Sequence, residues 1–148
     1  MIRQLKNKLI LISLLIFILS LFFNAFKVKD MGQIKDYSSL EVFLIGPISF
    51  LGGGIFEFFI WTANIWLLIS LFCVFRRHYF ISIISGLIAF LISGTFIFYK
   101  EILVSESGRM ADIYSLEIGY YLWLTSIVFI IFSSIYLKII DRISNAKT

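Results

Sequence analysis

Three polar side chains within an apolar stretch are the clearest candidates for chemistry. Glu57, Trp61 and Asn64 stand at i, i+4 and i+7, a spacing that places them on one face of a helix. A carboxylate in hydrocarbon costs roughly 2.5–3.5 kcal/mol at mid-helix, and such groups usually serve a function. The functional interpretation is a proton or cation site, or a buried hydrogen-bonding hub of Glu57 with Asn64. The alternative is a shallow carboxylate at the interface that reaches water or hydrogen-bonds the glycine-rich backbone at 52–54.

Other reactive side chains lack the partners that catalysis or metal binding requires. His78 is the only histidine and follows Arg76 and Arg77, and Cys73 is the only cysteine. A zinc site needs three or four converging ligands, a disulfide needs two cysteines, and a serine nucleophile needs an adjacent base. The sequence therefore predicts a protein that is not an enzyme and that holds no metal or cofactor.

Small side chains recur at helical spacing in two further apolar stretches. Such faces let helices approach closely in a membrane, where hydrophobicity supplies little attraction between helices. They predict helix packing within the chain or, as the alternative, between two copies of it. The residues that form these faces are Ser82, Gly86, Ala89 and Ser93 in the first stretch and Gly119, Ser126 and Ser133 in the second.

The elements that must position these residues are long apolar segments. The 148-residue chain is 60% hydrophobic with a mean hydropathy of +0.99, whereas soluble domains are roughly 45–50% apolar. About 20 apolar residues cross a bilayer as a helix. The sequence predicts one membrane domain, 1–148, with spans at about 9–26, 55–75, 79–99 and 119–137. We interpret the first as an uncleaved anchor, because it is longer than a signal-peptide core and lacks a small-residue cleavage site.

Two longer polar connections, at about 27–54 and 100–118, join these spans and are expected to be outer loops. In the first, Ser38 and Glu41 belong to a capping-box pattern before the apolar stretch 42–51, which predicts a short helix. Pro47 should interrupt it, since proline donates no backbone hydrogen bond. The predicted fold is an all-α integral membrane protein, an antiparallel four-transmembrane-helix bundle with a short extra interfacial helix between spans 1 and 2.

The distribution of basic residues predicts how the bundle is oriented. Eight lysines and arginines lie in the N-terminal end, the 76–78 turn and the C-terminal tail, against five in the two longer connections. Because positive charge favours the cytoplasmic side, both termini and the short turn are expected in the cytoplasm. The basic residues stand at the ends of apolar segments and form no stripe, so no nucleic-acid partner is expected.

Two motifs resemble an uncharacterised family of small bacterial four-helix inner-membrane proteins. Glu-x-x-x-Trp-x-Ala-Asn, from Glu57 to Asn64, resembles that family's second helix, and Gly-Tyr-Tyr-Leu-Trp-Leu, from Gly119 to Leu124, resembles its last. The resemblance implies a bacterial inner-membrane location and four spans, and it implies no activity. Disulfide-forming oxidoreductases, small multidrug transporters and glutathione-linked membrane enzymes differ from this chain at the residues that carry their chemistry.

These observations lead to two functional hypotheses. The first is a non-enzymatic interaction protein whose partners are the lipid bilayer and another membrane protein or a second copy of itself. Immunity against a membrane-inserting toxin is a concrete version of it. The alternative is a small oligomeric transporter or channel in which Glu57 and Asn64 line a polar path, formed by several copies because one chain has few intramembrane polar groups.

Overall fold

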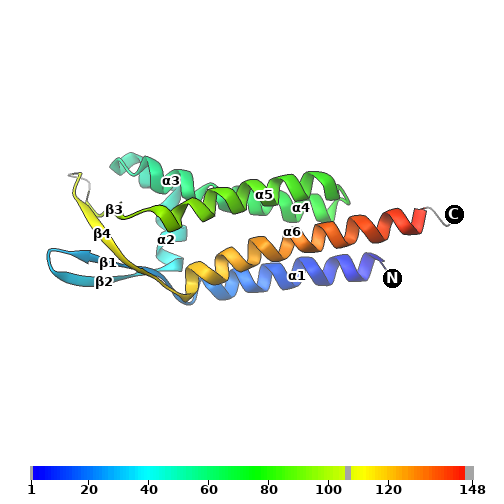
Figure 1. The fold of residues 1–148 in the computed structure, drawn as a ribbon, viewed down its shortest axis with the longest axis horizontal. Helices are drawn as coiled ribbons and strands as arrows, with labels where there is room; N and C mark the ends of the chain where they lie inside the picture. The colour runs from blue at the N-terminus through cyan, green and yellow to red at the C-terminus, as the bar shows by residue number, and fades with distance from the viewer. Residues whose placement is uncertain (1, 106–107, 146–148) are drawn as a thin grey trace.

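The computed structural model describes residues 2–105 and 108–145 as an elongated molecule with helices along its length and strands at one end (Figure 1). Four helices run side by side, with both termini at the end opposite the strands. A further helix, α3 (Ile55–Trp61), precedes α4 and is separated from it by Thr62. The four helices are α1 (Ile2–Ser20), α4 (Ala63–Phe75), α5 (Tyr79–Thr95) and α6 (Ile118–Asn145).

Among the described residues, three helical segments are long and apolar enough to cross a membrane. They are Ile55–Phe75, which joins α3 and α4, Tyr79–Phe98 and Ile118–Asn145, and they coincide with the predicted second, third and fourth spans. The first predicted span differs, because α1 begins with basic residues and ends at Ser20. Its apolar part from residue 9 extends only about 18 Å at 1.5 Å per residue. A membrane crossing by the first predicted span, 9–26, therefore stays a prediction.

A four-stranded antiparallel sheet contradicts the all-α prediction. Its strands are ordered β2-β1-β4-β3, and they lie mainly in the stretches predicted as the loops 27–54 and 100–118. Asn24 to Phe26, expected at the end of the first span, begin β1. Glu106 and Ser107, in the second of these predicted loops, and the tail from Ala146 fall outside the described residues. The strands are β1 (Asn24–Asp30), β2 (Gln33–Ser38), β3 (Glu101–Leu103) and β4 (Met110–Leu116).

A tight turn at Met31 and Gly32 connects β1 to β2. Asp30 pairs with Gln33 across the turn, so the hairpin loop has two residues. Both have positive φ, +49° at Met31 and +81° at Gly32, as the mirror-image turns of two-residue hairpins require. Glycine adopts this conformation without steric cost, which is why the chain can reverse so sharply here.

The predicted short helix is present between β2 and α3. Helix α2 (Ser39–Ile45) begins after Ser38, whose side-chain oxygen accepts a hydrogen bond from the Glu41 backbone N–H at 3.1 Å. The 3₁₀ helix η1 (Gly46–Gly52) follows directly, with proline in its first turn. The proline therefore changes the helix type at the position where the sequence predicts an interruption.

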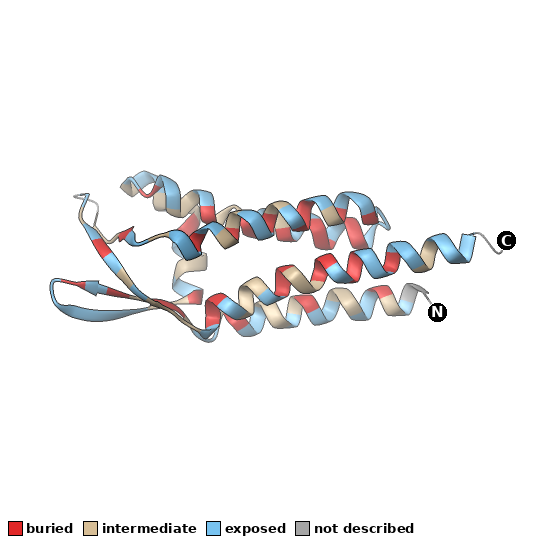
Figure 2. Ribbon diagram, in the orientation of Figure 1, coloured by how far each residue is buried: buried red, intermediate tan, exposed pale blue. Residues whose placement is uncertain are grey.

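Buried residues lie along the helices where these face one another, and they form the core (Figure 2). Its bundle part includes Leu67, Ile127 and Ile130, each at most 1% exposed. Three buried serines join α4, α5 and α6 in the same layer. The Ser82 hydroxyl lies 2.9 Å from that of Ser70 and 2.7 Å from that of Ser134.

The residues of the two small-residue faces are buried by packing within this one chain. Ser82, Ala89, Ser93 and Ser126 are completely buried, and Ser133 is 5% exposed. The two glycines of these faces, Gly86 and Gly119, are buried as well. Association between copies would need a different surface.

Gly86 provides a test of this packing, because its Cα faces α6 without room for a side chain. A Cβ at Gly86 would lie 2.6 Å from Ile131 Cγ1, whereas a Cβ at Gly94 in the same helix would meet nothing within 4 Å. We expect Gly86→Ala to lower the free energy of unfolding by about 1–3 kcal/mol through overpacking. Gly94→Ala should be neutral or stabilise the helix by up to about 1 kcal/mol.

The measurement is unfolding of both purified variants in micelles, followed by circular dichroism during titration with a denaturing detergent. Equal stabilities of the two alanine variants would contradict the close approach of α5 and α6 at Gly86.

Candidate functional site

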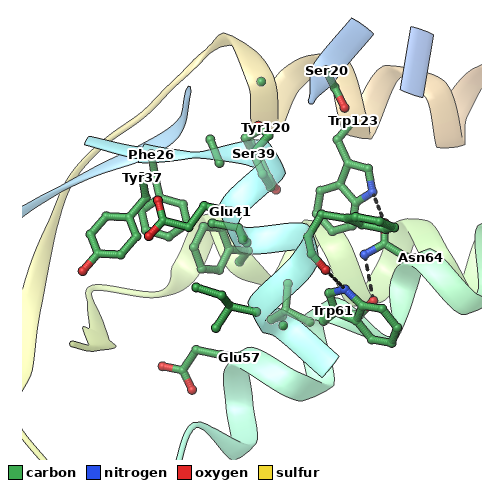
Figure 3. Close-up of a pocket in the computed structure, with 18 of the residues that line it drawn as sticks. Ser20, Phe26, Tyr37, Ser39, Glu41, Glu57, Trp61, Asn64, Tyr120 and Trp123 are labelled. Atoms are coloured by element: carbon green, nitrogen blue, oxygen red, sulfur yellow. Dashed lines mark hydrogen bonds between the residues drawn. The ribbon is translucent and has the colours of Figure 1, made fainter. Parts of the chain in front are cut away.

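An apolar cavity of about 190 Å³ lies where the sheet meets the helices. Its walls come from helices α1, α2, α3, α4 and α6, from strands β1, β2 and β3, and from the 3₁₀ helices η1 and η2 (Phe96–Phe98) (Figure 3). All three predicted site residues, Glu57, Trp61 and Asn64, line it. For comparison, an engineered cavity of roughly 150 Å³ holds benzene, so this space is large enough for a ring or a short branched chain.

Eight aromatic side chains contribute to the cavity wall. Several contact one another: Phe26 stacks on Tyr37 with ring centroids 5.2 Å apart, and Tyr120 meets Trp123 edge-on at 6.0 Å. Such pairs hold each ring in place, so the wall is formed before any ligand arrives. The eight are Phe17, Phe26, Tyr37, Phe43, Trp61, Phe96, Tyr120 and Trp123.

The Asn64 side chain is a hydrogen-bonding hub of the cavity. Its Nδ2 donates to the Trp61 carbonyl at 2.9 Å, and its Oδ1 accepts from Trp123 Nε1 at 2.9 Å. In turn, Trp61 Nε1 donates to the Phe43 carbonyl at 2.9 Å. These bonds connect α4 to α6 and α3 to α2. The predicted hub therefore contains Asn64, but its partners are the two tryptophans and not Glu57.

Glu57 occupies the opposite part of the cavity from this hub (Figure 3). Its Oε1 accepts a hydrogen bond from the Leu103 backbone N–H at 2.9 Å, so the half-buried carboxylate joins α3 to β3. The sequence-based alternative had this carboxylate binding the glycine-rich backbone. A Cβ at Gly54 would approach Glu57 Oε2 to 3.0 Å, so this backbone does lie beside it.

Ser39 is not among the site residues that the sequence predicts. Its side chain lines the cavity and is 8% exposed, and its hydroxyl has no hydrogen-bond partner among the described residues. Gly119, expected only in a helix-packing face, lies against this hydroxyl. A buried polar atom without a partner is rare and calls for an explanation. No periodicity or motif identifies this position, because the burial depends on α6.

The arrangement is suited to binding. The polar atoms of Asn64 and Trp123 are paired with each other, and the remaining wall is largely apolar. Within residues 2–105 and 108–145, no three His, Cys, Asp or Glu side chains converge as a metal site would require. A pre-formed apolar space with a few polar groups is the usual form of a small-ligand site.

A cluster of charges outside the cavity joins the two hairpins of the sheet. Asp30, only 4% exposed, lies 2.8 Å from Lys35 Nζ and 3.3 Å from Arg109 Nη2. The hydrogen bond from Lys35 lowers the pKa of the Asp30 carboxyl below its ordinary value, and the positive charge of Arg109 adds to this effect against the opposing effect of burial. The sequence analysis had counted these residues only as loop charges.

Comparisons of the chain with models of protein families, with curated proteins and with solved structures found no match. The resemblance to small four-helix inner-membrane proteins thus stays a prediction.

The charge cluster predicts acid sensitivity of the sheet. Because the pKa of Asp30 is lower in the folded chain than its ordinary value of 3.8, the cluster stabilises the fold above that pH and loses its effect as the pH falls through the folded pKa. We expect amide protection of residues 24–38 in hydrogen exchange to fall below about pH 4. Asp30→Asn should show this loss already at neutral pH.

The matched control is Asp36→Asn, since Asp36 is 55% exposed and 3.9 Å from Lys27. Exposed ion pairs contribute little, so this variant should keep wild-type protection. Equal behaviour of the two variants would contradict the role of Asp30.

Proposed function

We propose that the chain is a non-enzymatic integral membrane protein that binds another membrane component at the cavity between its sheet and its helices. The observation that carries this proposal is the cavity itself, which unites Glu57, Trp61 and Asn64 with aromatic rings from remote elements. Its rings and its Asn64 hub are already fixed by mutual contacts. A pre-organised site binds with little loss of conformational entropy, which favours recognition.

Insertion into a membrane is supported by the three candidate spans and by the apolar side chains that the helices expose. Leu68, Phe72 and Leu91 are 56%, 62% and 65% exposed, and water would make such a surface costly. The Arg76–Arg77 turn lies at the same end as both termini. With positive charge inside, the proposed orientation has the termini in the cytoplasm of a bacterial cell and the sheet outside.

The proposed partner approaches the sheet end, because the small-residue faces of the helices are buried within the chain. Immunity against a membrane-inserting toxin is the concrete version of this function, with the toxin engaging the cavity-bearing end. A second copy of the chain is the other partner that the sequence suggested. Either partner would meet a surface on which the charged sheet borders an apolar cavity.

The transporter alternative receives less support from the geometry. Both polar atoms of the Asn64 amide are engaged, and the Glu57 carboxylate is bound to the backbone of β3. On the terminal side of the cavity, Leu67 and Ile127 are buried in the bundle. A polar path lined by Glu57 and Asn64, as the several-copy alternative requires, would have to displace these contacts in each copy.

The orientation can be tested with single cysteines in a Cys73→Ser background. Ile34→Cys lies on β2, where Ile34 is 53% exposed, and Ser144→Cys lies near the end of α6. We expect a membrane-impermeant maleimide to label Cys at position 34 in intact cells. The label should reach position 144 only after permeabilisation, because that end is on the cytoplasmic side. The reverse pattern would contradict the orientation, and equal labelling of both would contradict membrane insertion.

Binding at the cavity can be tested by photo-crosslinking in native membranes. Ile45 lines the cavity and is 50% exposed, so a photoreactive phenylalanine analogue can replace it. The matched control carries the analogue at Phe132, 66% exposed on α6 and outside the cavity. We expect mass spectrometry to find one adduct of defined mass at position 45 and only lipid adducts at position 132. Identical adduct patterns at both positions would contradict a cavity-bound component.

A further inference from the structure

We propose that the cavity binds a small organic cation, a quaternary ammonium group carried on an aromatic or short branched body. This inference rests on the proposal that the cavity is a binding site, and it assigns the chemical class of the ligand. It depends on two features of the wall: the sign of its charges and its aromatic rings.

The charged groups of the wall are all acidic. Among the described residues that line the cavity, Glu41 and Glu57 carry the only charges, and none is basic. Figure 3 shows both carboxylates on the side of the strands, away from the Asn64 hub. Two carboxylates beside an apolar space repel an anion and attract a cation, and this effect is stronger than in bulk water because the surroundings are apolar.

The aromatic rings select the kind of cation. Aromatic faces attract cations, and groups of rings are the usual means by which proteins recognise quaternary ammonium ligands. A metal ion would need several converging oxygen, nitrogen or sulfur ligands, which the described residues do not provide. An organic cation is weakly hydrated and has an apolar body, so the same wall can accept both its charge and its bulk.

The size of the cavity limits the body of the ligand. The cavity volume of about 190 Å³ fits a single substituted ring.

The test compares two probes of the same shape that differ in charge. They are 3-hydroxyphenyltrimethylammonium and its neutral isostere 3-tert-butylphenol, each titrated into the full chain in dodecyl maltoside micelles. Binding is followed by calorimetry and by tryptophan fluorescence, since Trp61 and Trp123 line the cavity. We expect saturable binding of the cation with an affinity at least about tenfold above that of the isostere.

Three glutamate variants locate the charge effect. Glu57→Gln retains a carbonyl oxygen for the Leu103 N–H. It should lower the affinity for the cation severalfold without changing the affinity for the isostere. Glu41→Gln, on an exposed residue of α2, should have the same selective effect and remains informative if Glu57→Gln fails to fold. Glu101→Gln removes the same charge from an exposed residue of β3 outside the cavity and should change nothing.

The other outcomes overturn the inference in distinguishable ways. If both probes bound equally, and neither Glu41→Gln nor Glu57→Gln changed this, the cavity would still be a binding site but would not select a cation. If all three variants lowered the affinity for the cation equally, the cation would respond only to the net charge of the protein and not to the charges of the cavity wall. Displacement of the cation by phosphatidylethanolamine, but not by phosphatidylglycerol, would assign the site to a lipid headgroup. Absence of binding by either probe would overturn the ligand class, and the proposed function would fail with it only if the photo-crosslink at position 45 were absent too.

Discussion

The pairing of β1 with β4 is the constraint on which the rest of the structure depends. It joins the segment that follows α1 to the segment that precedes α6, with Phe26 opposite Leu116 and Lys29 opposite Asp112. Because both strands lead directly into or out of a long helix, the pairing fixes how α1 and α6 begin to pack. It also places the sheet across the end of the bundle, where α2 and η1 must pass beside it. The cavity is the space that remains between these elements.

Polar groups at the cavity position the elements that surround it. The Asn64 amide connects α4 to α6, and the Glu57 carboxylate connects α3 to β3. In a largely apolar setting, a hydrogen bond left unmade is expensive, so each of these pairs restrains two elements that are distant in the sequence. The Ser39 hydroxyl differs from them, since its burial is imposed by Gly119 without a compensating partner. The wall is thus held in place where its polar atoms are paired, and the Ser39 hydroxyl is buried behind it without a partner among the described residues.

The sequence predicts the helices well because their signal is local. Hydropathy over about 20 residues suffices to find the segments 55–75 and 79–98, and helical spacing alone places Glu57, Trp61 and Asn64 on one side. The strands could not be found in this way. Their charged residues resemble those of loops, and β1 is specified by partners in β4 that lie far along the chain. The contacts of Glu57 with Leu103 and of Asn64 with Trp123 depend on that pairing, as does the burial of Ser39.

The position of the cavity along the molecule bears on what it can do. Toward the termini, the interlocked serines Ser70, Ser82 and Ser134 and their apolar neighbours fill the bundle interior. Toward the sheet, the wall contains the two carboxylates, and the charge cluster of the hairpins lies outside it. A ligand that entered from the sheet side would meet the acidic groups first, then the aromatic rings, and finally a packed helical core. This order of groups would hold the proposed ligand at the end of the bundle, because the packed interior leaves it no route through the helices of one copy.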